Sequence, residues 1–324
     1  MKALLQAHHV PSVAISVIRN RQIQWSAAYG LRAPDAPATD DTLYNIASMA
    51  KPISAEVALR LASQKRFTLD EPMYKDWTDP DMANDDRRKL LTPRVALTHR
   101  TGFPNWRYQT GNVLTFAFTP DSSYSYSGEG YEYLARFLEK RTGSSFEDLA
   151  QRLVLGQIGM QDTAYTQQPW FKDRVASPAD AGGNFQTPVF ARSAVASDLV
   201  YATSSDYAKF LIAVSNGAGV TTVLAKERVV RSPGKTYKCA PTPDYKCPVT
   251  GVGLGWEVIS FDQEDILMHL GRDQGTFSIG YIDLKTGDGM VMLTNGDLGN
   301  RLLVRVLELS AADPKWIKFV KDQM

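Results

Sequence analysis

Residues 42–61 read TLYNIASMAKPISAEVALRL, and this stretch changes from extended to helical character at Ser48. The apolar residues Ile53, Val57 and Leu61 recur every four positions, which is the spacing of one face of a helix. A serine at the start of a helix lies against unpaired backbone N–H groups and the end of the helix dipole that favours negative charge. Ser48 therefore has the setting of a nucleophile.

Lys51 follows Ser48 by three residues, so the two side chains share one face of the helix. A lysine amine that is shielded from water can take the proton of a serine hydroxyl. Pro52 disfavours the α conformation at Lys51 and is accepted only near a helix start, which predicts a tight first turn. A second Ser-x-x-Lys begins at Ser232, but it lies in a stretch rich in Pro and Lys without helical periodicity, so we predict no site there.

The composition is that of an ordinary globular protein, with 324 residues, 44% hydrophobic and 22% charged, and a formal net charge of +1. This length allows two core-forming units. The charges form no long run of either sign, which argues against nucleic acid and membrane surfaces and favours a small or neutral partner. No apolar run could span a membrane, and the first residues lack the apolar core of a signal peptide. We expect a cytoplasmic protein, or a periplasmic or secreted one whose leader has been removed.

Cys239 and Cys247 are the two cysteines, with seven residues between them in a Pro-rich loop. Such a pair favours a disulfide and an oxidising compartment, although the sequence leaves open whether the bridge forms. A zinc site is disfavoured because no His or further Cys lies near enough in sequence to complete four ligands.

The hydrophobic pattern divides the chain into three parts. Residues 1–66 begin with a β-hairpin, predicted by alternating apolar residues from Val13 to Trp25 around a turn at 19–21. Residues 67–186 are rich in Pro, Asp, Asn and charge and are predicted to be a helical insertion. Residues 187–324 complete the first part, with strands predicted at 254–259, 266–270, 276–283 and 290–293 and a helix from about residue 300.

Three helix starts and stops can also be predicted. A helix at 131–141 is followed by Gly143 as its stop, and Ser144 with Glu147 predicts a capping box for the next helix. Thr203, three residues before Asp206, opens another helix.

Two further stretches offer partners for a serine nucleophile. Tyr126 lies in YSYSGEGY (124–131), just before a helix, where a neighbouring ammonium such as Lys51 would lower the pKa of its phenol towards that of a useful base. His269 precedes Leu270-Gly271, where the imidazole could hydrogen-bond that phenol and Gly271 permits close approach of a substrate backbone. Both groups also have a structural interpretation, because clustered tyrosines pack and a lone histidine is more often structural.

Together these motifs resemble the serine β-lactamase and penicillin-binding-protein-like superfamily, in particular its class C-like branch of esterases and D-peptidases. Ser-x-x-Lys is a known element of these enzymes, and residues 96–104, 202–210 and 251–256 are similar to recurring patterns of the branch. The resemblance covers nearly the whole chain. It implies an α/β (α+β) fold, in which an antiparallel sheet flanked by helices is built from both chain ends, with an all-helical insertion and the active site between them.

The resemblance also implies roles for individual residues. Ser48 would be the acylated nucleophile, Lys51 and Tyr126 the proton-transfer pair, and His269 would hold the position usually taken by Lys or His. The backbone N–H groups of Ser48 and Arg272, next to Gly271, would form the oxyanion hole. No cofactor or metal is needed.

The implied activity is that of a serine hydrolase acting through a covalent acyl-enzyme, most simply an esterase or a hydrolase of D-amino-acid peptides and amides. A class C-like β-lactamase or D,D-carboxypeptidase is the alternative, and a non-catalytic binding protein on the same scaffold is the third hypothesis. The expected partner is a small ester, amide or peptide substrate. The chain contains no Gly-x-Ser-x-Gly and no His-Glu-x-x-His, which disfavours an α/β-hydrolase and a zinc peptidase.

One position departs from the family pattern. The motif Tyr-x-Asn reads Tyr126-Ser127-Gly128 here, and Gly128 offers no amide to grip an acylamino carbonyl or to steady the lysine. We therefore expect poor β-lactam hydrolysis, improved by an asparagine at 128, while ester hydrolysis survives. Glu129 is interpreted as a surface carboxylate.

A literal Lys-Thr-Gly at Lys285 competes with His269 for the position beside the serine. It lies between two strand-like runs and has the composition of a hairpin turn, so we predict that Lys285 faces solvent.

Overall fold

A large antiparallel sheet carries the fold in the computed structural model, which describes residues 1–262 and 264–324. Within these residues the sheet has eight strands in the order β3-β2-β1-β11-β10-β9-β8-β7. Their bounds are Ser12–Arg19 (β1), Gln22–Ala33 (β2), Ala36–Pro37 (β3), Val249–Val252 (β7), Glu257–Phe261 (β8), Glu264–Asp273 (β9), Thr276–Asp283 (β10) and Gly289–Thr294 (β11). The predicted hairpin β1–β2 pairs with the last strand, Val13 opposite Thr294, so both chain ends build one sheet.

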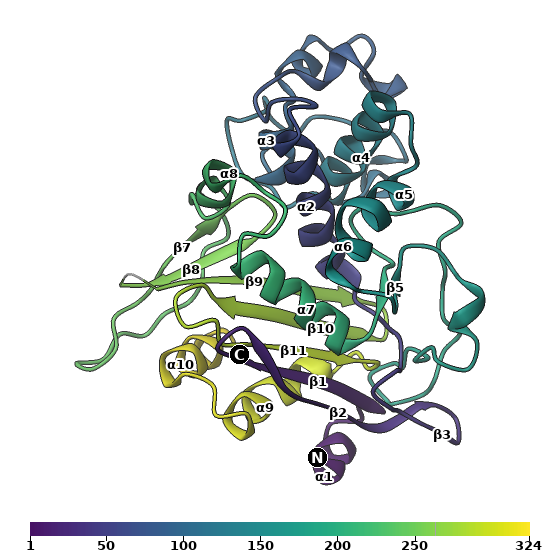
Figure 1. Cartoon of the computed structure of the whole chain (residues 1–324), viewed down its shortest axis with the longest axis vertical. Coiled ribbons are helices and arrows are strands. Elements are labelled where there is room, and N and C mark those ends of the chain that lie inside the picture. The colour runs from purple at the N-terminus through teal and green to yellow at the C-terminus, as the bar shows by residue number, and fades with distance from the viewer. Residues whose placement is uncertain (263) are drawn as a thin grey trace.

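Alternation along the strands gives this sheet two buried faces. Val13, Ile15 and Val17 of β1 lie in the core beneath the C-terminal helices α9 (Leu303–Leu309) and α10 (Pro314–Gln323). Ala14 and Ile18 point to the opposite core, which is covered by α7 (Ser204–Ser215; Figure 1). The short α1 (Lys2–Ala7) packs beside β2 through Leu5.

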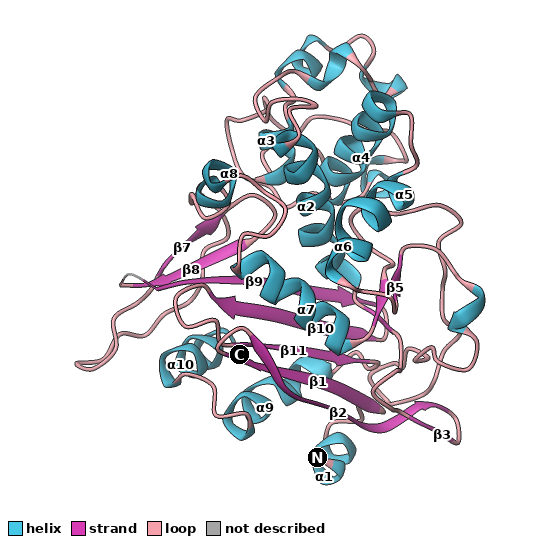
Figure 2. Ribbon diagram, viewed as in Figure 1, coloured by secondary structure: helices cyan, strands magenta, loops and turns pink. Residues whose placement is uncertain are grey.

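The helices of the insertion lie above one edge of the sheet (Figures 1 and 2). They are α3 (Pro93–Leu97), α4 (Gly128–Thr142), α5 (Phe146–Ala150) and α6 (Gly156–Ile158), the last two joined by a π-helical turn. They surround α2 (Ala50–Ser63), which is buried from Ala50 to Leu61. A small second sheet of β4 (Tyr44–Asn45), β6 (Tyr201–Ala202) and β5 (Thr163–Ala164) ties the insertion to the segment before Ser48, and α8 (Thr222–Glu227) lies near β7 and β8 (Figure 1).

The predicted helix ends are mostly confirmed. Ser127 caps α4, which begins three residues before the predicted start, and Gly143 ends it with φ +72°. Thr203 caps α7 by accepting a hydrogen bond from the backbone of Asp206. The capping box at Ser144 is wrong by one residue, because Ser145 is the N-cap of α5 and the Glu147 carboxylate accepts from Tyr165 and Thr166 instead.

The late strands are confirmed with shifted ends. The strand predicted at 254–259 starts at Glu257, because a hydrogen bond from Gly253 N–H to the Trp256 carbonyl makes the preceding residues a turn. Helix α10 was not predicted, although Trp316, Phe319 and Val320 bury one of its faces. The two cysteines form a disulfide between Cys239 and Cys247.

Candidate active site

The turn before α2 holds Ser48 at the edge of the sheet. It contains a short 3-10 helix, Ala47–Met49, and Ala47 has φ +48°, a conformation that L-residues with a Cβ adopt rarely. The Asn45 side chain accepts a hydrogen bond from Ala47 N–H at 2.9 Å, and the Ile46 carbonyl accepts one from Ser278 of β10 at 2.8 Å. The predicted transition from an extended segment to a tight helical turn is confirmed.

Lys51 lies beside the serine, as its spacing predicts. Its Nζ is 3.0 Å from Ser48 Oγ and donates to the Ser197 carbonyl at 2.9 Å. Burial of the ammonium lowers the pKa of Lys51 to about 8, while the negative charges of Asp198 and Glu132 act in the opposite direction. An amine with this pKa is largely neutral in mildly alkaline solution, where it can accept the serine proton.

Tyr126 completes the group, but its electrostatics differ from the prediction. Burial raises the pKa of Tyr126, and the hydrogen bond with Ser48 opposes this rise only in part. Lys51 Nζ lies 4.8 Å from the centroid of the tyrosine ring, so its charge faces the π system. The expectation of a phenol acidified by Lys51 is therefore wrong, and Tyr126 is a neutral phenol that can pass a proton on.

His269 lies close to this group in its neutral form. Burial and the nearby Lys51 ammonium lower the pKa of His269 to about 3. Its Nδ1 is 2.7 Å from the Leu270 carbonyl, so Nδ1 carries the proton and Nε2 is left as an acceptor. The ring centroid is 6.4 Å from that of Tyr126, and in the described part of the chain no hydrogen bond joins the two side chains. The predicted hydrogen bond to the phenol is thus not formed.

Gly271 and Arg272 lie in β9, next to the segment that precedes Ser48. A Cβ at residue 271 would lie 2.2 Å from the Ile46 carbonyl oxygen and 2.1 Å from Ser278 Oγ, so this glycine lets the segment before Ser48 approach β9. The space at this Cβ position is therefore filled by the protein's own chain. The Arg272 guanidinium points to the other face of the sheet, 5.8 Å from the Phe277 ring centroid, which leaves only its backbone N–H for the predicted oxyanion role.

One edge of β9 has no paired strand beside these residues in the part of the chain that the structure describes. Strand β8 pairs with β9 only as far as Met268, so, among the described residues, 269–273 pair with β10 on one side and with no strand on the other. An open edge of this kind can pair with an extended peptide.

Several side chains around the site were not singled out from the sequence. The His99 ring stacks on Tyr126, with centroids 4.3 Å apart, and its Nδ1 accepts a hydrogen bond from Ser127 N–H at 3.1 Å. The Glu132 carboxylate accepts from both the backbone and the hydroxyl of Ser197, at 2.9 and 2.7 Å, and so fixes the carbonyl that Lys51 contacts. His99 lies in the segment 96–104 that carried part of the resemblance, whereas Glu132 has no sequence signal.

The space beside Gly128 is already filled. A Cβ at this position would be 2.9 Å from the Asn105 carbonyl oxygen and 3.3 Å from both Asn105 Oδ1 and Ser197 Oγ. Asn105 Oδ1 accepts a hydrogen bond from Gly128 N–H at 2.8 Å, so the Asn105 side chain occupies the region into which an asparagine at 128 would extend.

The interpretation of Glu129 as a surface carboxylate is wrong. Its side chain is buried and makes an ion pair of 2.8 Å with Arg107, which also pairs with Asp79 at 3.0 Å. This ion-pair cluster holds the start of α4 in place. The charge of Arg107 offsets the cost of burying the Glu129 carboxylate.

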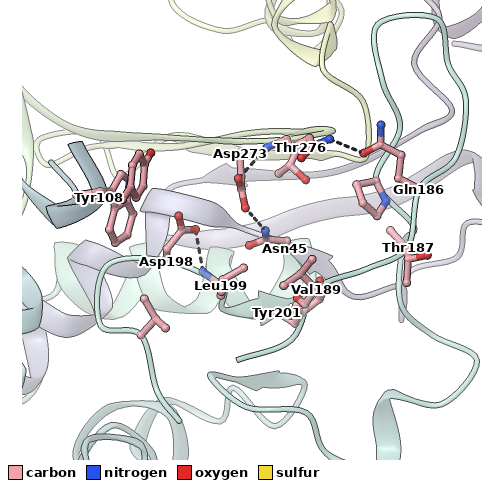
Figure 3. A pocket seen from close by; sticks show the side chains of 15 residues that line it. Asn45, Tyr108, Gln186, Thr187, Val189, Asp198, Leu199, Tyr201, Asp273 and Thr276 are labelled. Carbon is pink, nitrogen blue, oxygen red and sulfur yellow. Dashed lines mark hydrogen bonds between the residues drawn. The ribbon is translucent and has the colours of Figure 1, made fainter. Parts of the chain in front are cut away.

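A cavity of about 450 Å³ is lined by Asn45, three residues before Ser48, and by Asp198, next to the Ser197 whose carbonyl Lys51 contacts; Figure 3 shows its lining. Its walls come from β4, the segment 176–201, the end of β9 and the loop that carries Trp106 and Tyr108. Asp198, which follows Ser197, and Asp273, which ends β9, both line it.

The two competing motifs lie away from this cavity. Lys285 is in the β10–β11 turn, with 62% of its side chain exposed and its Nζ 2.8 Å from Glu264, which confirms the solvent-facing turn. Lys235 of the second Ser-x-x-Lys lines a different cavity, next to Phe319 of α10. No group of three or more His, Cys, Asp or Glu side chains suited to a metal ion occurs in residues 1–262 and 264–324, and no helix in these ranges is long and apolar enough to cross a membrane.

Comparison with known sequences gives a consistent result. The family model described as Beta-lactamase matches residues 1–312. Penicillin-binding protein 4 of Amycolatopsis lactamdurans is 25% identical over 320 residues, covering 91% of this chain and 83% of that protein. Esterase EstB of Burkholderia gladioli is 29% identical over 196 residues, so the match spans 51% of this chain and 49% of the esterase.

Solved structures share the fold. The octameric penicillin-binding protein homologue from Pyrococcus abyssi has a TM-score of 0.79 at 19% identity, covering 97% of this chain and 76% of that chain. The D-alanine carboxypeptidase AmpC from Burkholderia cenocepacia has a TM-score of 0.74 at 18% identity, covering 93% and 95%. At these identities the likeness is one of fold, and it confirms the predicted antiparallel sheet flanked by helices.

The placement of His269, rather than Lys285, beside Ser48 can be tested by mutation. His269→Ala is expected to lower kcat/KM for p-nitrophenyl acetate by ~10²-fold, because it removes a polar group from beside Lys51 and Tyr126. Lys285→Ala is the control and should stay within ~3-fold, as exposed changes do. Steady-state kinetics of both variants, with circular dichroism to verify folding, would measure this. A large loss in Lys285→Ala with little loss in His269→Ala would contradict the placement.

Proposed function

Because this chain belongs to the beta-lactamase family, we propose that it is a serine hydrolase acting through an acyl-enzyme on Ser48, an esterase or a hydrolase of D-amino-acid amides and peptides. One observation carries the proposal: the Nζ of a fully buried lysine, Lys51, lies 3.0 Å from Ser48 Oγ. A lysine kept from water beside a hydroxyl at a helix start is what an activated serine needs. The named relatives include an esterase and a penicillin-binding protein.

The proposed reaction begins when the neutral amine of Lys51 accepts the Ser48 proton while Oγ bonds to the substrate carbonyl carbon. The negative charge that develops on the carbonyl oxygen is held by the backbone N–H groups of Ser48 and Arg272. Tyr126, as a neutral phenol, relays the proton to the leaving oxygen or nitrogen as that bond breaks. Water then hydrolyses the acyl-enzyme by the reverse sequence of proton transfers, and no cofactor takes part.

Two features bear on the choice of substrate. Asn105 fills the place where the family's asparagine would contact an acylamino group, which favours simple esters over β-lactams. The open edge of β9 at 269–273 favours an extended peptide as a second candidate substrate, as in a D,D-carboxypeptidase. The intact contact between Ser48 and Lys51 argues against a non-catalytic binding protein.

Covalent labelling tests the nucleophile. A fluorophosphonate probe is expected to modify Ser48 alone, because among the serines that the structure describes only Ser48 combines a helix start, a buried lysine and a proposed oxyanion site. Peptide mass spectrometry would locate the label, which should vanish in Ser48→Ala and persist in the control Ser232→Ala. Label recovered on Ser232, or undiminished labelling of Ser48→Ala, would overturn the assignment.

The kcat/KM for an ester should depend on the protonation state of Lys51. With the pKa of Lys51 lowered to about 8, kcat/KM for an ester is expected to rise with pH and to level off above that value, because only the neutral amine accepts a proton. The Asp198 carboxylate stabilises the ammonium, so Asp198→Asn should lower the pKa of Lys51 and move the inflection to lower pH. A pH–rate profile that is flat from pH 6 to 10, or a shift to higher pH in Asp198→Asn, would refute Lys51 as the base.

Substrate preference gives a further prediction. We expect a much higher kcat/KM for p-nitrophenyl butyrate than for nitrocefin. The value for nitrocefin should stay far below the ~10⁶ M⁻¹s⁻¹ of an efficient enzyme. The structure reverses the expectation for Gly128→Asn, because a Cβ there meets the Asn105 carbonyl at 2.9 Å. This overpacking should cost about 1–3 kcal/mol of stability without raising nitrocefin turnover.

Gly128→Ala carries the same Cβ and is the matched control for Gly128→Asn. Thermal melts and nitrocefin kinetics of both variants separate the steric effect from that of the amide. A Gly128→Asn variant that is as stable as the wild type and gains β-lactamase activity would show that Asn105 does not block this position.

A further inference from the structure

The cavity lined by Asn45, Asp198 and Asp273 carries negative charge that the proposed reaction does not use. Asp198 and Asp273 come from different segments and line the same cavity, and Figure 3 shows the carboxylate of Asp198 hydrogen-bonded to Leu199 and that of Asp273 hydrogen-bonded to Asn45. Burial and the charge of Asp273 raise the pKa of Asp198 to about 6, so Asp198 is mostly ionised above neutral pH.

Neither carboxylate has a cationic partner at salt-bridge distance within the described ranges. Asp198 accepts a hydrogen bond from Leu199 N–H at 2.8 Å, and Asp273 accepts from Asn45 Nδ2 at 3.2 Å and from Gln274 N–H at 2.8 Å. The lining of the cavity contains no Lys, Arg or His among the residues that the structure describes. Lys51 acts on Asp198 through space, but its Nζ is hydrogen-bonded to Ser48 and Ser197, and as the neutral base it would balance neither charge.

Aromatic rings complete the wall. Trp106, Tyr108 and Tyr201 line the same cavity as the two carboxylates. The Tyr201 hydroxyl is engaged with the Val189 carbonyl at 3.0 Å, which fixes the position of its ring. Ring faces attract cations, and weakly hydrated organic cations such as quaternary ammonium groups suit such surroundings best. A formed cavity with these walls distinguishes the site from acidic residues on an open surface.

The order of residues along β9 tells which part of the substrate meets this cavity. The substrate carbonyl would lie at the backbone N–H of Arg272. His269 is on one side of that position, near Tyr126, which would protonate the leaving group. Asp273 is on the other side and lines the cavity. The leaving group therefore lies towards Tyr126 and the acyl group towards Asp273.

We propose that this cavity is the acyl-binding site and that it selects acyl groups carrying a cationic nitrogen, an ammonium or quaternary ammonium a few bonds from the scissile carbonyl. The assignment of the acyl side rests on the proposed function, whereas the affinity of the cavity for an organic cation does not.

A pair of matched esters tests the selectivity. The p-nitrophenyl ester of 4-(trimethylammonio)butanoic acid and that of 5,5-dimethylhexanoic acid have the same shape and differ by the charge on one atom. The wild type is expected to hydrolyse the cationic ester with a kcat/KM at least ~10-fold higher, and added salt should reduce this ratio. Equal rates, or a preference for the neutral ester, would overturn the proposal.

The ratio of the two kcat/KM values is also the readout for variants, because it cancels any general loss of rate. Asp273→Asn should lower the ratio, and the double change with Asp198→Asn should bring it to about one, since neutral amides attract a cation far less than carboxylates do. Asp86→Asn removes the same charge at a side chain that is 82% exposed in the insertion, and it should leave the ratio unchanged. A ratio that falls equally in Asp86→Asn would assign the preference to the net charge of the protein rather than to the cavity.

A binding measurement separates this proposal from the proposed function. Trp106 lines the cavity, so its fluorescence can be used to titrate ligands into the Ser48→Ala variant. The dissociation constant of 4-(trimethylammonio)butanamide should be at least ~10-fold lower than that of 5,5-dimethylhexanamide. Asp273→Asn in the same background should remove the difference. If neither ester is hydrolysed but this preference holds, the proposed function fails and the cation site stands. If the esters are hydrolysed and no preference appears in either experiment, the cation site fails and the hydrolase stands.

Discussion

The burial of Lys51 is the constraint on which the rest of the site depends. An ammonium without water is costly unless it is paired or becomes neutral, and the pKa of about 8 shows that neutrality is within reach here. The same helix also buries Glu56, but that carboxylate lies 2.8 Å from an Arg228 nitrogen and 4.0 Å from Arg60. Lys51 instead has a hydroxyl and a carbonyl as partners. Within helix α2, the charge of Glu56 is thus compensated by arginines, whereas the charge of Lys51 is free to change.

The turn that places Ser48 depends on the sheet for its geometry. Ala47 holds a left-handed conformation that would be unfavourable in an isolated peptide. It persists because the Ile46 carbonyl is held by Ser278 of β10 and because Gly271 of β9 has no side chain to keep that segment away. Residues more than 200 positions apart therefore fix one turn, which explains why the site lies where the helical insertion meets a sheet built from both chain ends.

The features that the sequence predicted correctly depend on residues close together along the chain. The Ser48–Lys51 pairing, the caps at Ser127 and Thr203 and the turn at Lys285 follow from spacing within a few residues. The stacking of His99 on Tyr126, the filling of the space at Gly128 by Asn105 and the meeting of Asp198 with Asp273 depend on contacts between distant segments. The direction of the shift in the Tyr126 pKa does not follow from the sequence for the same reason, because the burial of Tyr126 depends on how the insertion packs.

Asp198 links the proposed base to the proposed acyl site. Its carboxylate raises the pKa of Lys51 in the free protein and also faces the cavity. A cationic acyl group bound next to Asp198 would balance that negative charge and add a positive one, and both effects favour the neutral form of Lys51. The substrate that fits the cavity would therefore increase the fraction of the lysine that can accept the serine proton. In this arrangement the charge of Asp198 contributes both to substrate selectivity and to catalysis. A neutral acyl group of the same shape would therefore bind more weakly and would also leave Lys51 less often neutral.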